Sequence, residues 1–237
     1  MQMRSNVFSS IILSLGIISS SFLLGKSFEN YQNFGRYINV KGLDEKIVKS
    51  NFSTWNLSFT SANNDLKKIY FEISASQKKI IQFLKAQGFD EKEIEIQTIS
   101  VTDNRAQAYS NINVNTPRYS ANSGITLSTN KVDLVSLVAQ KTGELVESGV
   151  VINNSYIRYA YTDLNSIKPE MLTRATANAK EAAATFAENS NSSVGKIRKA
   201  TQGVFTITSV DGYDSHGDEG SILKKVRVVT SVEFFIN

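Results

Sequence analysis

The stretch that decides the fold runs from Pro169 to Gly195, PEMLTRATANAKEAAATFAENSNSSVG. Alanine dominates its middle, and alanine has the highest helix propensity of all residues. Pro169 suits the first turn of a helix, where its missing N–H costs nothing, and Glu170 complements the positive end of the helix dipole. The sequence therefore predicts a helix that begins at Pro169 and stops at Asn191, with a strand from Lys196 onward.

This helix carries one apolar stripe at three- and four-residue steps: Leu172, Ala175, Ala179, Ala182, Ala183 and Phe186. Most of these side chains are small, and small side chains let a helix lie close to its neighbour. We therefore expect a tightly packed, core-facing helix. No glycine-rich phosphate-binding pattern or other cofactor motif accompanies it, so no cofactor and no cofactor-binding residue is predicted.

The first 26 residues resemble a targeting segment. Arg4 precedes an uncharged run of 18 residues, Val7 to Leu24, and Lys26 follows it. This length lies between the apolar core of a signal peptide, about 7–15 residues, and a membrane span of about 20. Two alternatives therefore stay open, a cleaved signal peptide and an uncleaved signal anchor.

Either alternative predicts export to the periplasm or cell envelope, with contact between the N-terminus and a membrane. An uncleaved segment would anchor residues 7–24 in the inner membrane. Residues 27–36 are then a tether, and residues 37–237 form the folded domain.

Composition limits the other classes of function. The chain has 237 residues, of which 41% are apolar and 20% charged, as in an ordinary globular protein. The net charge of +4 is small, and no lysine or arginine stripe alternates with aromatic residues, so no nucleic-acid partner is expected. The absence of cysteine excludes disulfides, thiolate catalysis and cysteine zinc sites.

Alternating apolar residues predict the strands of the domain. The first strand begins at Tyr37–Val40, and the charged residues Asp44, Glu45 and Lys46 suit a connecting segment. The second strand places Trp55, Leu57 and Phe59 on one face. Later strands are predicted around Ile94–Val101 with a bulge near Thr98, and at Tyr119–Ser128, Val150–Tyr161, Lys196–Val210 and Leu223–Ile236.

Two further helices are predicted from helical spacing. The first is capped by Asn63–Asp65, closed by Gly88, and carries the stripe Leu66, Ile69, Ile73, Ile80 and Leu84. The second is capped by Asn130, closed by Gly149, and carries Leu134, Val135, Val138 and Leu145. Glu91, Glu93 and Glu95 alternate along a strand and are expected to protect its edge. Helices separated by hairpins imply an α+β fold of mainly antiparallel sheets packed with three helices.

Several segments in this order resemble the SIMPL-domain family of exported bacterial envelope proteins, whose biochemical function is unknown. They are Val40–Gly42, Leu84–Thr98 (LKAQGFDEKEIEIQT), Tyr119–Ala121 and Arg174–Gly195 with the following Lys196-Ile197. The resemblance implies an α+β fold, export, no established catalytic residues and, in some members, self-assembly or a link to stress tolerance.

The sequence contains no catalytic constellation. The only histidine, His216, lies in VDGYDSHGDEG, residues 210–220, which is typical of a solvated loop. The acidic side chains around it do not follow EF-hand spacing, so no metal site is predicted. The weak candidate ligands in this segment are Asp211, Asp214, His216 and Asp218. No Gly-x-Ser-x-Gly nucleophile motif is present.

A run of tyrosines with one arginine is the candidate interface: Tyr156, Arg158, Tyr159 and Tyr161. Tyrosine and arginine are enriched at interface hot spots. The sequence thus predicts a non-enzymatic envelope protein that forms a homo-oligomer or binds an envelope protein partner. The alternative is a periplasmic protein that binds a small ligand or a metal.

Overall fold

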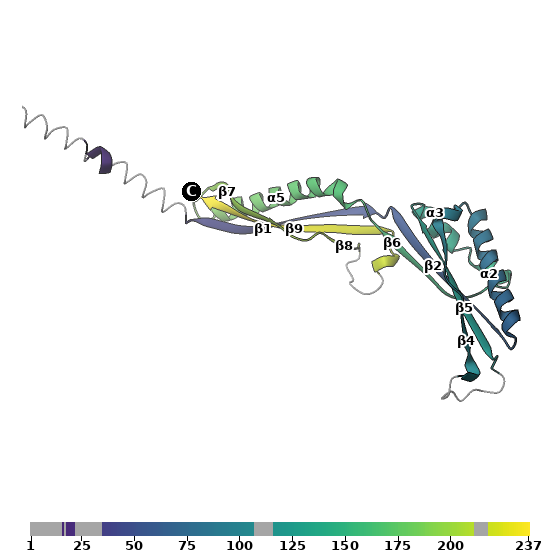
Figure 1. The fold of residues 1–237 in the computed structure, drawn as a ribbon. Coiled ribbons are helices and arrows are strands. Elements are labelled where there is room, and N and C mark those ends of the chain that lie inside the picture. The colour runs from purple at the N-terminus through teal and green to yellow at the C-terminus, as the bar shows by residue number, and fades with distance from the viewer. Residues whose placement is uncertain (1–15, 17, 22–34, 107–115, 211–217) are drawn as a thin grey trace, which may run out of the picture. The chain divides into compact units, whose positions relative to one another are not determined.

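A computed structural model describes residues 16, 18–21, 35–106, 116–210 and 218–237 (Figure 1). The chain divides into two compact units. Unit 1 is drawn from Met1–Lys46, Ile167–Thr206 and Arg227–Asn237, and unit 2 from Ile47–Ser166 and Ile207–Val226. Each of the two sheets is accompanied by helices, so the predicted α+β fold is confirmed.

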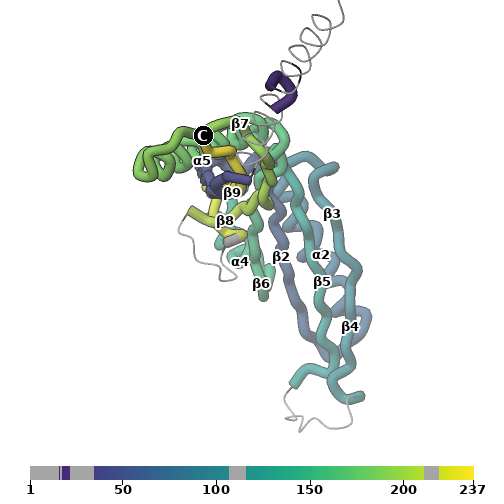
Figure 2. Tube along the Cα trace, turned by 90° about the vertical axis from the view of Figure 1, so that its left-hand side faces the viewer, coloured from purple at the N-terminus to yellow at the C-terminus, as the bar shows by residue number. Residues whose placement is uncertain are grey.

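Unit 2 is organised around β2 (Phe52–Asn63), which lies between β5 (Tyr119–Thr129) and β6 (Val151–Ala160) and pairs with both in antiparallel fashion (Figure 2). The short strands β3 (Ile94–Ile96) and β4 (Ser100–Asp103) pair in succession with the other side of β5. The predicted bulge near Thr98 is thus a break between two strands.

Three helices pack with this sheet: α2 (Leu66–Ala86), α3 (Val132–Ala139) and α4 (Gly143–Glu147). Their apolar sides and one face of the sheet form the core. Its largest fully buried side chains in unit 2 are Trp55, Phe59, Leu57, Ile69, Ile73, Ile80, Leu84, Ile125, Leu127, Val135 and Val138. The predicted stripe of α2 is confirmed except at Leu66, which is 52% exposed.

The ends of α2 follow the sequence prediction. The Asp65 carboxylate accepts hydrogen bonds from the N–H groups of Lys67 and Lys68, and Gly88 has a left-handed φ of 98°. The single helix predicted for residues 130–149 is instead the pair α3 and α4. The cap position of α3 is Lys131 rather than Asn130, and Gly149 closes the segment with a φ of 89°.

Two of the three glutamates predicted on a strand lie in a 3-10 turn, Glu91–Glu93, so that prediction was wrong for them. The Glu93 carboxylate accepts hydrogen bonds from Thr129 Oγ1 at 2.6 Å, from the Asp90 N–H at 2.8 Å and from Lys131 Nζ at 3.1 Å. Burial opposes ionisation of Glu93, but these hydrogen bonds outweigh it and hold its pKa below the usual range.

The sheet of unit 1 has the order β1 (Tyr37–Lys49), β9 (Leu223–Ile236) and β7 (Val194–Gln202). The short strand β8 (Thr206–Ser209) also pairs with β9, so the predicted strand Lys196–Val210 is interrupted. The long helix α5 (Leu164–Glu188) lies along this sheet (Figure 1). The buried core between α5 and this sheet consists of Val40, Ala179, Ala183, Val232 and Phe234.

Helix α5 begins at Leu164, so the prediction that Pro169 occupies its first turn was wrong. The buried residues recur strictly every fourth position: Ile167, Met171, Ala175, Ala179, Ala183 and Ala187. Phe186 is 59% exposed and does not belong to the packed face. The predicted stop is confirmed, because Asn191 has a left-handed φ of 51° just after the helix.

Close contact with β1 explains the small residues of α5. A Cβ atom built on Gly42 would lie 2.6 Å from the backbone nitrogen of Ala179, and closer still to the carbonyl oxygen of Ala175. Asp44, Glu45 and Lys46, predicted in a connecting segment, lie inside β1, where Asp44 alternates onto the buried face. The connection to β2 is the shorter Ser50-Asn51.

The predicted targeting segment 7–24 and the tether 27–36 lie largely outside the described residues. Within the described ranges, none of the helices is both long and apolar enough to cross a membrane.

Candidate functional site

Strand β6 forms one edge of the unit 2 sheet. In the part of the chain that the structure describes, β2 is its only strand partner. Its first seven residues, Val151–Ile157, carry no charge, and Val151 and Tyr156 are 58% and 39% exposed. The register with β2 shifts at Asn153, which has no opposite residue and so forms a bulge.

The opposite edge of the same sheet is protected. Its strands β3 and β4 are only three and four residues long. Glu95 lies on β3, and Asp103 at the end of β4 forms an ion pair of 2.9 Å with Arg118. Short strands, charges and bulges are usual means of preventing unwanted strand pairing, and β6 lacks the first two over Val151–Ile157 but has a bulge at Asn153.

A polar cluster lies at the end of this uncharged run. Tyr156 donates a hydrogen bond of 2.6 Å to Glu219 Oε2, and Arg158 Nε lies 3.3 Å from Glu219 Oε1. Glu219 belongs to the short 3-10 helix η3 (Asp218–Gly220). The hydrogen bond to the Glu219 carboxylate, together with burial, raises the pKa of Tyr156.

Because successive side chains of a strand point to opposite faces of the sheet, the four predicted interface residues do not form one surface. Tyr156 and Arg158 meet at Glu219, whereas Tyr159 is 6% exposed and belongs to the core of unit 2. Burial is the main cause that raises the pKa of Tyr159. Tyr161 follows β6, half-buried, with its hydroxyl 3.5 Å from Ser166 Oγ. Of these four residues, only Tyr156 and Arg158 are exposed.

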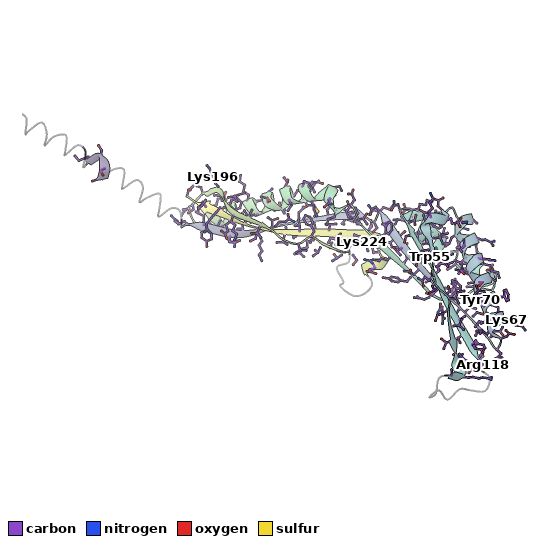
Figure 3. The ribbon with its side chains drawn as sticks, in the orientation of Figure 1. Trp55, Lys67, Tyr70, Arg118, Lys196 and Lys224 are labelled. Atoms are coloured by element: carbon purple, nitrogen blue, oxygen red, sulfur yellow. The ribbon has the colours of Figure 1, made fainter. Side chains whose placement is uncertain are left out.

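A hollow of about 380 Å³ adjoins this cluster. It is lined by Arg158, Tyr159, Ala160, Tyr161, Ile207, Glu219 and Lys224. Lys224 is 4% exposed, and Figure 3 labels it in β9. These groups can orient a small polar ligand, but they do not pair a nucleophile with a general base.

Sequence reasoning missed Lys224 and the role of Glu219. Lys224, Val226 and Val228 follow one another at two-residue steps. The alternation of the strand could therefore have predicted that Lys224 lies on the buried face of β9. No local pattern predicts the contact of Glu219 with β6, because the residues in contact are 61 to 63 positions apart in the sequence.

The candidate metal ligands are not assembled by the described structure. Asp211, Asp214 and His216 lie outside the described residues, and Asp218 begins η3. Across residues 35–106, 116–210 and 218–237, no group of three or more histidine, aspartate or glutamate side chains could hold a metal ion.

Comparison with known proteins identifies the family but no activity. No curated protein matches the chain. The family model of SIMPL, described as a protein of unknown function (DUF541), matches residues 38–224, which include nearly all of unit 2 and about half of unit 1. The order of segments noted in the sequence and this match agree, and the chain belongs to the SIMPL family.

Proposed function

We propose that this chain is an exported envelope protein that acts without catalysis, by assembling with copies of itself or by binding an envelope partner. The observation that carries the proposal is the uncharged edge of β6. The uncharged run behind Arg4 supports export, and the family resemblance supports a setting of stress tolerance.

Strand addition is the mode of contact that suits β6. A strand at a sheet edge presents a row of backbone N–H and C=O groups that an added strand satisfies with main-chain hydrogen bonds. Because Val151–Ile157 is uncharged, two copies of this strand meet without like-charge repulsion. Tyr156, held by Glu219 beside the edge, adds an aromatic side chain of the type enriched at interfaces.

Light scattering on residues 27–237 tests the proposal. We expect a mass that is a multiple of the monomer, and expect Asn154→Lys to lower it because the new charge lies on the free edge. Asn122→Lys is the matched control, since Asn122 is also exposed but lies on β5, which has partners on both sides. A monomer at high micromolar concentration contradicts self-assembly, and equal effects of both variants contradict the β6 contact.

The hollow beside Arg158 favours a second candidate, binding of a small polar ligand. Its volume of about 380 Å³ falls in the range of small-molecule pockets, about 300–1,000 Å³. Thermal unfolding with added metal ions, amino acids or dicarboxylates tests this alternative, because a ligand that binds only the folded chain raises the melting temperature. Arg158→Met should abolish such a shift, whereas metal binding by residues 211–218 should survive it.

A further inference from the structure

Helix α2 exposes two large aromatic side chains that contact each other. Phe71 is 70% exposed and Tyr70 56%. The rings of Tyr70 and Phe71 pack edge to face, with centroids 6.2 Å apart and an angle of 72° between their planes. Figure 3 labels Tyr70 and its neighbour Lys67 on this helix.

The position of Phe71 on the helix shows that the core does not use it. At about 100° per residue, Phe71 lies roughly 200° from both Ile69 and Ile73. These two residues are fully buried, so Phe71 points away from the sheet of unit 2. Lys67 precedes Phe71 by one helical turn and Lys78 follows it by two, so both share its side of the helix.

The lysines around Phe71 leave this side positively charged. Lys67, Lys68 and Lys78 are exposed, and none of them forms an ion pair with a described residue. The two nearby carboxylates, Asp65 and Glu72, are hydrogen-bonded to neutral groups of unit 2, so three lysines outnumber two carboxylates and the side keeps a net positive charge. Asp65 accepts from two backbone N–H groups at the helix start, and Glu72 accepts from Ser61 Oγ and Asn63 Nδ2, both at 2.7 Å.

We propose that this surface, the α2 patch, binds the anionic headgroup layer of a lipid bilayer. The α2 patch consists of Lys67, Lys68, Tyr70, Phe71 and Lys78. Exposed aromatic side chains on a lysine-rich helix match a membrane interface, where the rings enter the headgroup region and the lysines meet lipid phosphates.

The charge of the α2 patch decides between this occupant and two others. A second copy of the patch would place lysines opposite lysines, which is unfavourable. A soluble polyanion would satisfy the lysines but leave Tyr70 and Phe71 in water. Only a surface with both negative charge and an apolar layer satisfies both sets of side chains. This inference does not depend on strand pairing through β6.

A site-specific fluorescent label tests the proposal in the full-length chain. The natural chain has no cysteine, so Ala75→Cys provides a single attachment point one turn from Phe71. An environment-sensitive dye there should shift to shorter wavelength with vesicles of phosphatidylglycerol and phosphatidylcholine, and not with phosphatidylcholine alone. The readout is local, so binding of the N-terminal segment to the same vesicles does not produce it. The control label is Glu147→Cys, an exposed position on α4, which should not shift.

Variants of the α2 patch separate charge from insertion. In the Ala75→Cys background, Lys67→Glu with Lys68→Glu should raise the lipid concentration for half-maximal shift about tenfold or more. Phe71→Ser should reduce the wavelength shift at saturating lipid. The matched charge control, Lys92→Glu with Lys180→Glu, changes two exposed lysines outside the patch. It should leave the lipid concentration for half-maximal shift unchanged.

Four results would overturn the proposal. They are no shift with anionic vesicles, an equal shift with neutral vesicles, an equal shift with soluble polyphosphate, and a shift that grows with protein concentration in the absence of lipid. The last would assign the α2 patch to contact between copies of the chain.

Discussion

Replacement of Gly42 by alanine should destabilise unit 1, whereas replacement of an exposed residue in the same strand should not. The added Cβ would lie 2.6 Å from the nitrogen of Ala179, and closer to the carbonyl oxygen of Ala175. Both are backbone atoms of α5, so no side-chain rotation relieves the overlap. Since ordinary contact needs about 3.5 Å, the helix must retreat from β1 by about 1 Å or more.

The size of the stability loss depends on the packing that is disrupted when α5 moves away from β1. Overpacking in a well-packed interior costs about 1–3 kcal/mol. Ala175, Ala179 and Ala183 are all fully buried, and their short side chains cannot extend to refill a widened gap. We therefore expect a loss near the upper end, about 3 kcal/mol, in the free energy of unfolding of unit 1.

Urea unfolding followed by two probes measures this loss. Far-UV circular dichroism reports all helices including α5, whereas the only tryptophan, Trp55, lies in the core of unit 2. Gly42→Ala should shift the circular dichroism transition to lower urea and move the fluorescence transition less. Lys41→Ala in the same strand and Gly143→Ala, where nothing lies within 4 Å of an added Cβ, are the controls. If Gly42→Ala unfolds at the wild-type midpoint, the close contact between α5 and β1 is refuted.

Three further predictions concern helix packing, pH dependence and capping. Ala183→Leu should lower stability by about 1–3 kcal/mol in urea unfolding through overpacking, while Ala177→Leu on the exposed side of α5 should change it little. The pKa of Glu93 is lower in the folded chain than in the unfolded chain. The Glu93 carboxylate therefore adds to the free energy of unfolding above its unfolded pKa, and this contribution is lost as the pH falls through its folded pKa. Glu93→Gln should therefore reduce the loss of stability as the pH falls below the unfolded value, and Glu95→Gln, on an exposed side chain, is the matched control. Asp65→Ala should cost about 1 kcal/mol in thermal unfolding because two N–H groups of α2 lose their acceptor.

Large side chains made unit 2 predictable from sequence. Trp55, Leu57 and Phe59 alternate, and Ile69, Ile73, Ile80 and Leu84 follow helical spacing, because each element buries bulky residues on one side only. Such periodicity identifies both the type of element and its inward face. The glycines at 88 and 149 marked the segment ends for a separate reason, since both adopt a left-handed φ.

The packed face of α5 could not be found in the same way. Alanine occurs on its buried side at Ala183 and on its exposed side at Ala177, so hydrophobicity does not separate the two. Phe186 fits the three- and four-residue spacing of the predicted apolar stripe, but it is 59% exposed. The deciding partner, Gly42, is more than 130 positions away and carries no side chain that a pattern could detect.

The candidate site was predictable only in part. The run from Tyr156 to Tyr161 was visible in the sequence, but the removal of Tyr159 into the core follows from the register of β6 on β2. The free edge itself is a property of strand order, which places β6 last in the unit 2 sheet. Local sequence contains no signal for strand order, because order depends on pairing between distant segments.

The two proposed surfaces of unit 2 are linked by the symmetry of strand pairing. If two β6 strands pair in antiparallel fashion about a two-fold axis, the axis is perpendicular to the combined sheet, so both copies keep their helix layers on the same side. Both α2 patches then face one membrane, and the second patch binds at a high effective concentration. We therefore expect Asn154→Lys, which lies outside the α2 patch, to weaken binding of the full-length chain to anionic vesicles as measured by the label at position 75. Asn122→Lys should leave it unchanged. If Asn154→Lys abolishes the oligomer but the lipid concentration for half-maximal shift stays the same, the paired copies do not present their α2 patches to one surface, and antiparallel pairing through β6 is wrong.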